Sequence, residues 1–348
     1  MNFDIVMPSI LFFVTLAAIF IGKRAEKKLK ATVEEREFKS RDTALLVGVI
    51  AVAVSVIVFI PSLALMSLFL FSYSSLLFTV TYAFSSFKRH RATLYCVGLI
   101  VASMLAVAAG FLGIMPADLA FFGIFAFAGF GALTFISLLY ARTQPAEKLK
   151  LYLAALPPAL FVLLFGFFRS TFLWFPYLLD VFGIIFALLI VIYLSGLFTW
   201  KSMFIFAGAL TLTDIILVWI TQTMVQAAEH ISGLGLPVLV AFPTIPLIST
   251  AAGIQIMRLG LGDFFFSGIL ASQTMKKYGR KTAVLSLGAI CVSFGLFELI
   301  LLNKELANAL PVPALPATLP ILIGWLPVIS VKMLLERKKK QSGNPPGP

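Results

Sequence analysis

The sequence predicts an all-α fold, a multi-pass bundle of transmembrane helices, on the strength of three observations. Of its 348 residues, 60% are hydrophobic and 12% are charged, whereas soluble domains are typically about 45–50% apolar and about 25% charged. Apolar runs of about 20 residues, the length that crosses a hydrocarbon core of about 30 Å, recur along the chain. The positive charges lie between these runs, as expected for connectors that stay on one side of a membrane.

Eleven apolar segments are candidate crossings. The long region between residues 43 and 84 is divided at Pro61, because proline interrupts a helix. The first run follows Asp4 and precedes a basic stretch, the reverse of the charge order in a signal peptide, so we interpret it as a helix of the protein. The candidates are residues 5–22, 43–61, 63–84, 92–115, 118–141, 151–168, 179–199, 202–225, 246–275, 282–302 and 312–333.

The distribution of lysine and arginine predicts the orientation. With the N-terminus outside, 24 of the 27 Lys and Arg residues lie in inner connectors or in the C-terminal tail, as the positive-inside rule requires. We therefore expect an outer N-terminus and a cytoplasmic C-terminus, and the compact loops favour a prokaryotic cytoplasmic membrane. The net charge of +12 belongs to these connectors, so membrane lipids, and not nucleic acid, are the expected partners.

Three acidic residues lie well inside apolar runs: Asp214, Asp263 and Glu298. A carboxylate at mid-membrane costs at least about 2.5 kcal/mol, so it requires a partner or a function. Asp214 follows Lys201 by 13 residues, and Asp263 precedes Lys276 by 13 residues. In antiparallel helices that rise 1.5 Å per residue, both carboxylates then lie roughly 20 Å from the inner edge of the membrane. Asp180 is near a segment end, where an interfacial position is expected.

Two carboxylates that face each other cannot both ionise easily. One keeps a proton while the other acts as a base, which is the arrangement that aspartic proteases use to activate water. The alternatives for such a residue are a hydrogen bond between packed helices and a proton or ion site. Glu298 is interpreted as a packing contact or as part of a polar network.

Two irregular segments accompany the aspartates. GLGD at residues 260–263 places two glycines directly before Asp263, and glycine permits close backbone approach. The segment PVPALPATLP at 311–320 contains four prolines, which predict irregular backbone. At membrane depth such backbone is tolerated only where protein buries it or where it lines a watery cavity, although a simple helix start is the alternative. Counting back from Lys332 places Ala314 close to the aspartate level.

These residues resemble a known family. GLGD, within RLGLGDFFFSG, closely resembles the catalytic motif of presenilins and signal peptide peptidases, and PALP at 313–316 resembles the PAL motif of the same GxGD intramembrane aspartyl proteases. The order also matches, since the GxGD motif follows the first aspartate by about fifty residues and the PAL motif follows after about fifty more. The resemblance implies that Asp214 and Asp263 are the catalytic pair. It also implies residues that support the active site and position the substrate, namely Gly260, Leu261, Gly262, Pro313, Ala314 and Leu315.

The resemblance covers residues 202–333, the expected catalytic region. Residues 1–201 would then be a transmembrane scaffold, and residues 334–348 a disordered basic tail. The expected orientation resembles that of signal peptide peptidases and is opposite to that of presenilin. Two features differ from the family: Thr213 stands where the family usually has tyrosine, and eleven candidate crossings stand against the family's nine.

The sequence therefore predicts a presenilin-like intramembrane aspartyl endopeptidase of nine to eleven helices. Its expected substrates are transmembrane helices or signal peptides, and no metal or cofactor is expected. HExxH and GxSxG motifs do not occur, so zinc and serine mechanisms have no support. A proton- or ion-coupled transporter would use the same aspartates, but no internal repeat is visible. A prepilin-type peptidase would cut near the inner face and has no PALP segment.

Overall fold

The structure is a computed structural model, and its described part is mostly helical. It describes residues 2–32, 38–84, 146–250, 253–303 and 316–341, with a few isolated residues between 97 and 113. Within this part, six helices are long and apolar enough to cross a membrane, so the chain is a membrane-embedded helical protein. The expected crossings 92–115 and 118–141 lie almost entirely outside the described residues, and the count of nine to eleven stays a prediction.

The chain forms two compact units. The smaller unit contains residues 28–32 and 66–178, and the larger contains residues 1–27, 33–65 and 179–348. In the smaller unit, Tyr73 of α3 (Ser62–Phe84) packs edge-on against Phe161 of α6 (Ala146–Phe168), with ring centroids 6.1 Å apart. The turn η2 (Trp174–Leu178) places Trp174 against the end of α6.

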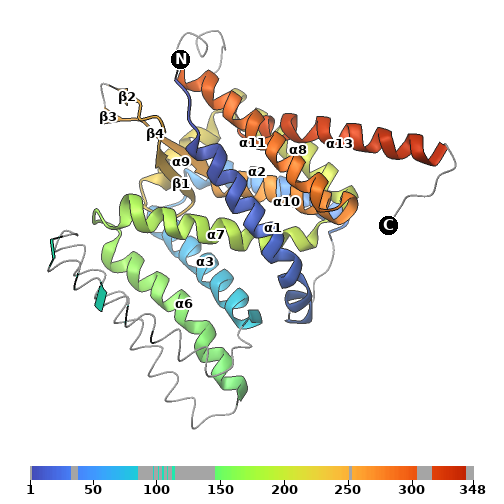
Figure 1. The fold of residues 1–348 in the computed structure, drawn as a ribbon. Helices are drawn as coiled ribbons and strands as arrows, with labels where there is room; N and C mark the ends of the chain where they lie inside the picture. Colours follow the sequence, from blue (N-terminus) through green and yellow to red (C-terminus); the bar gives the residue numbers. More distant parts are fainter. Residues whose placement is uncertain are drawn as a thin grey trace. The chain divides into compact units, whose positions relative to one another are not determined.

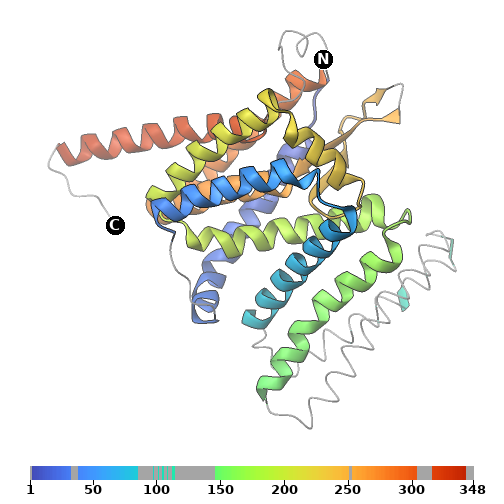
Figure 2. The ribbon, with the colours of Figure 1, turned by 180° about the vertical axis from the view of Figure 1, so that it is seen from behind.

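The larger unit contains the helices that the sequence predicts for the catalytic region, together with earlier ones. Its central helix is α10, of whose 18 residues eleven are buried. This helix packs against α7, α8, α11 and α13 (Figure 1). Viewed from behind, α2 lies beside α8 and α9 (Figure 2). The bounds are α1 (Val6–Thr32), α2 (Ser40–Ile57), α7 (Leu179–Leu194), α8 (Trp200–Ile215), η4 (Ile216–Ile220), α9 (Thr223–Ser232), α10 (Leu261–Tyr278), α11 (Arg280–Leu302) and α13 (Thr318–Gln341).

Small residues and a few polar contacts hold these helices together. An added Cβ at Gly324 in α13 would lie 2.5 Å from the carbonyl oxygen of Ala289 in α11, so only glycine permits this close helix contact. Trp325 Nε1 donates a 3.0 Å hydrogen bond to Thr274 Oγ1, which ties α13 to α10. Gln273 Nε2 donates to the carbonyl of Ser195 at 3.2 Å, which ties α10 to the turn between α7 and α8.

One predicted crossing is wrong in its first half. The sequence predicts one helix over residues 246–275, but α10 begins only at Leu261. Prolines and glycines interrupt the apolar run that precedes Leu261. The chain between Leu239 and Gly260 instead forms two antiparallel strand pairs. The all-α prediction did not include this small β-element. The pairs are β1 (Leu239–Pro243) with β4 (Ile256–Gly260), and β2 (Ser249–Thr250) with β3 (Gly253–Ile254).

Other boundaries also differ from the prediction. The expected segment 202–225 ends at Ile220, where Gln222 adopts a left-handed φ of 56° and turns the chain into α9. The expected disordered tail is helical over residues 334–341, because these are mostly good helix formers with no glycine or proline. Helices α2 and α7 and most of α1 belong to the same compact unit as α8 to α13, and the expected division at residue 201 stays a prediction. The predicted break at Pro61 is confirmed, because it lies between α2 and α3.

Candidate active site

Asp214 lies near the end of α8, two residues before the wider π-helical turn η4 begins. Its side chain is buried, with 8% of the residue exposed. Oδ2 accepts a hydrogen bond of 2.6 Å from Oγ1 of Thr318, the first residue of α13. The backbone N–H of Thr318 donates to the same carboxylate. Asp214 is therefore held by the beginning of another helix.

Asp263 lies in the first turn of α10, directly after the strand β4. Gly260 is the N-cap of this helix and has an extended conformation, with φ −72° and ψ 150°. Its backbone N–H donates to the Asp263 carboxylate. An added Cβ at Gly260 would lie 3.3 Å from Asp263 Oδ2, so a larger residue would press on the carboxylate. The positive end of the helix dipole also favours a negative charge in this turn.

The two aspartates come together from separate helices. Helices α8 and α10 pack against each other, and the Asp214 and Asp263 carboxylates are close enough to interact electrostatically. Equal depth, counted along the sequence from the flanking lysines, had placed them at one level. A pair of neighbouring carboxyl groups can hold one proton between them and can act as acid and base in the same reaction.

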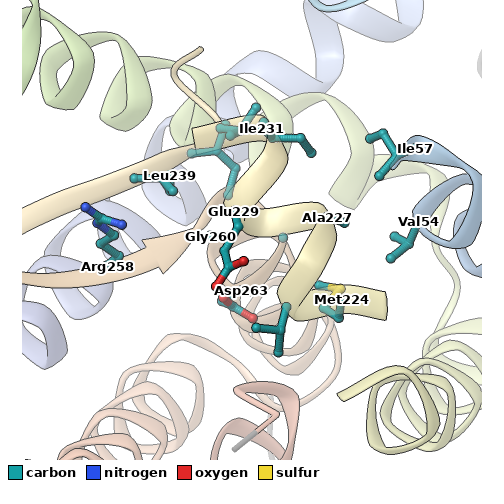
Figure 3. Close-up of a pocket in the computed structure, with 14 residues that line it drawn as sticks. Val54, Ile57, Met224, Ala227, Glu229, Ile231, Leu239, Arg258, Gly260 and Asp263 are labelled. Atoms are coloured by element: carbon teal, nitrogen blue, oxygen red, sulfur yellow. The ribbon is translucent and has the colours of Figure 1, made fainter. Parts of the chain in front are cut away.

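A cavity of about 430 Å³ borders Asp263 (Figure 3). Its size is within the usual range of ligand sites, about 300–1,000 Å³. In Figure 3, Asp263 lies between Val54 and Ile57 of α2 on one side and Leu239 and Arg258 of the strands on the other. The lining is mostly apolar, and Asp214 is not part of it. The lining residues are Val54, Ile57, Met224, Val225, Ala227, Glu229, Ile231, Val238, Leu239, Arg258, Gly260, Leu261, Gly262 and Asp263.

Of the predicted supporting residues, the structure brings three to the cavity. Gly260, Leu261 and Gly262 line it directly beside Asp263. The other three, Pro313, Ala314 and Leu315, lie outside the described residues. The described chain resumes at Pro316, and two residues later Thr318 contacts Asp214.

Helix α7 covers one edge of the β1–β4 pair. Ala241 is opposite Arg258 in the register, and the ladder's hydrogen bonds direct the backbone groups of Ala241 away from β4. Its N–H donates a 2.7 Å hydrogen bond to Oδ1 of Asp180 in α7. One turn further along α7, an added Cβ at Gly183 would lie 3.1 Å from the carbonyl oxygen of Leu239, so helix and strand are in close contact.

The opposite edge of the pair belongs to β4. The same alternation directs the backbone N–H and C=O groups of Ile256 and Arg258 away from β1. Arg258 is exposed and lines the cavity next to Asp263. An extended peptide that pairs with this edge would pass the carboxylate.

The sequence did not identify two of these polar contacts. Asp180 was expected at the membrane interface with no partner named; it is buried in the protein, with 5% exposed, and its partner lies 61 residues further along the chain. Thr318 could have been noticed as a hydroxyl that follows the PALP segment by two residues. Glu298 in α11 is also buried, and it interacts electrostatically with Asp4.

In the part of the chain that the structure describes, no group of three or more His, Cys, Asp or Glu side chains could hold a metal ion. Comparison with family models, curated proteins and solved structures gave no match to this chain.

Proposed function

We propose that this protein is an intramembrane aspartyl endopeptidase that hydrolyses peptide bonds in transmembrane segments or signal peptides. The observation that carries the proposal is the proximity of Asp214 and Asp263, which come from two membrane helices, with Asp263 beside a cavity and a strand edge that pairs with no described strand. The GLGD and PALP motifs support its assignment to the presenilin and signal peptide peptidase family. The charge distribution supports an outer N-terminus and a cytoplasmic C-terminus in a prokaryotic membrane.

The reaction would use the pair as acid and base. The ionised carboxylate takes a proton from water while the oxygen attacks the scissile carbonyl carbon. The protonated partner gives its proton to the carbonyl oxygen, so a neutral tetrahedral diol forms. When the C–N bond breaks, one carboxyl delivers its proton to the leaving nitrogen, and a diol hydroxyl returns a proton to the other.

A transmembrane helix must unwind locally before it can be cut, because the scissile carbonyl accepts a hydrogen bond within the helix. The outward edge of β4 offers hydrogen-bonding groups to an extended segment at the level of Arg258, a few residues before Asp263. Strand addition at this edge would replace the helical hydrogen bonds that the substrate loses. The apolar walls of the cavity suit the side chains of membrane segments.

The test is cleavage of a panel of signal peptides and type II transmembrane peptides by the purified protein, with mass spectrometry of the products. Wild type is compared with Asp214→Asn and Asp263→Asn, and Glu298→Gln provides the control of a buried carboxyl outside the cavity lining. We expect products from wild type and Glu298→Gln alone. Wild-type rates in either aspartate variant would contradict the proposal. Uptake into vesicles that depends on Asp263, without any products, would indicate a transporter instead.

A further inference from the structure

Thr318 offers Asp214 more than one donor. Its hydroxyl lies 2.6 Å from Oδ2, its backbone N–H donates to the same carboxylate, and the residue is 5% exposed. The first N–H groups of a helix have no acceptor within that helix, and the helix dipole places positive charge at this end. A negative charge on Asp214 is therefore stabilised by the beginning of α13.

Among the described residues, Asp263 receives fewer donors than Asp214. Gly260 gives it one backbone N–H, and its side chain borders the cavity, where a substrate or water can reach it. Hydrogen bonds donated to a carboxylate favour its charged form, and neighbouring acids hold one proton between them. Both carboxylates lie at the beginning of a helix, so the helix dipole favours a charge on either, and the hydrogen bonds from described residues distinguish the two members of the pair.

We propose that Thr318 is a positioning residue that keeps Asp214 ionised and oriented as the base, so that Asp263 carries the proton and acts as the acid. The inference rests on the proposed function and assigns the two roles within it. In the first step, Asp214 takes the proton from water, and Asp263 protonates the carbonyl oxygen of the scissile bond. In the second step, Asp214 gives its proton to the leaving nitrogen, and a diol hydroxyl returns one to Asp263.

The charged neighbours of Asp214 are few in the described part of the chain. Helix α10 contributes Asp263, which interacts with it electrostatically. Helix α2 carries its ionisable residues, Arg41 and Asp42, in its first turn at the inner end. The first ionisable residue of α13 is Lys332, 14 residues after Thr318 and so about 21 Å away along the helix. The hydroxyl of Thr318 is therefore the side-chain donor whose removal should change how Asp214 ionises.

Valine in place of Thr318 removes the hydroxyl at nearly the same volume and leaves the backbone N–H. The matched control is Thr211→Val, one turn before Asp214 on α8, because Thr211 Oγ1 is buried without a hydrogen-bond partner among the described residues. For Thr318→Val we expect kcat to fall about tenfold with KM unchanged. The acid limb of the pH–rate profile should move to higher pH, because the charged base has lost a donor. Thr318→Ser should restore both, and Thr211→Val should match wild type.

A wild-type rate and pH profile in Thr318→Val would overturn the inference, since a residue that only packs α13 against α8 would tolerate valine. A second measurement does not depend on activity. Thermal unfolding of Thr318→Val, Asp214→Ala and the double variant should show coupling, with Thr318→Val costing stability only while Asp214 is present. If the stability changes of the two single variants simply add in the double variant, while the wild type cleaves peptides, the role of Thr318 is wrong and the proposed function stands. Absence of cleavage by wild type would overturn the proposed function and, with it, the acid and base roles.

Discussion

The backbone N–H of Ala241 in β1 donates a 2.7 Å hydrogen bond to Oδ1 of Asp180 in α7. This carboxylate supplies an acceptor that the strand itself does not have, because the N–H lies on the edge that does not face β4. Strand β1 pairs with β4, and β4 ends at Gly260, the N-cap of the helix that carries Asp263. Helix α7 thus fixes the strand pair from which the GLGD turn begins.

Removing this acceptor should loosen the strand pair. We expect Asp180→Ala to lower the free energy of unfolding by about 1–3 kcal/mol, because a buried N–H is left without a partner. Asp180→Asn keeps an acceptor oxygen and should lose less. Thermal unfolding of the purified protein in detergent measures both. An Asp180→Ala variant as stable as wild type would show that water or a neighbouring group replaces the carboxylate.

The close contact between α7 and β1 predicts a second effect. An added Cβ at Gly183 would lie 3.0 Å from Val240 Cγ2 and 3.1 Å from the carbonyl oxygen of Leu239, and the backbone oxygen cannot move without displacing the strand. We expect Gly183→Ala to destabilise the protein by about 1–3 kcal/mol. Gly208→Ala in α8 is the matched control, since nothing lies within 4 Å of its added Cβ. Equal unfolding temperatures for the two variants would refute the prediction.

The two glycines of GLGD should affect cleavage in different ways. A Cβ at Gly260 would press on Asp263 Oδ2 at 3.3 Å, so for the proposed protease Gly260→Ala should displace this carboxyl group and lower kcat about tenfold to a hundredfold. Gly262 has nothing within 4 Å of an added Cβ and lines the cavity, so Gly262→Ala should narrow the substrate site and raise KM. Steady-state kinetics on one cleaved peptide separates these effects. The prediction fails if Gly260→Ala alters KM alone.

The sequence predicted the parts of this site that depend on regular geometry. The helix rise is constant, so counting from Lys201 and Lys276 was enough to place Asp214 and Asp263 at one level. The interval between α9 and α10 was not predictable in the same way, because an apolar run of this length is compatible with a membrane helix or with paired strands. Contacts such as Asp180 with Ala241 join residues far apart in the chain, and no local pattern encodes them.

Hydropathy alone predicted one helix too long and another too short. The segment 246–275 is apolar enough for a crossing, yet Pro246 and Gly253 interrupt it and the helix begins only at Leu261. At the other end of the chain, the charged residues after Leu335 suggested disorder. They are good helix formers that follow directly on an apolar helix, so α13 continues to Gln341.

A buried repulsion between Glu298 and Asp4 predicts a stabilising substitution. Asp4 accepts hydrogen bonds from the backbone N–H groups of Val6 and Ile245. These bonds join the start of α1 to the loop after β1 and give the Asp4 carboxyl its partners. Glu298 is 4% exposed, and its Oε2 has no hydrogen-bond partner among the described residues. We expect Glu298→Gln to raise the unfolding temperature by about 2–4 °C, because the amide removes a buried carboxyl that has no partner among the described residues. Asp4→Asn should have the opposite effect and lower the unfolding temperature, because its hydrogen bonds to the backbone weaken with the loss of charge. A Glu298→Gln variant that is less stable than wild type would contradict the prediction.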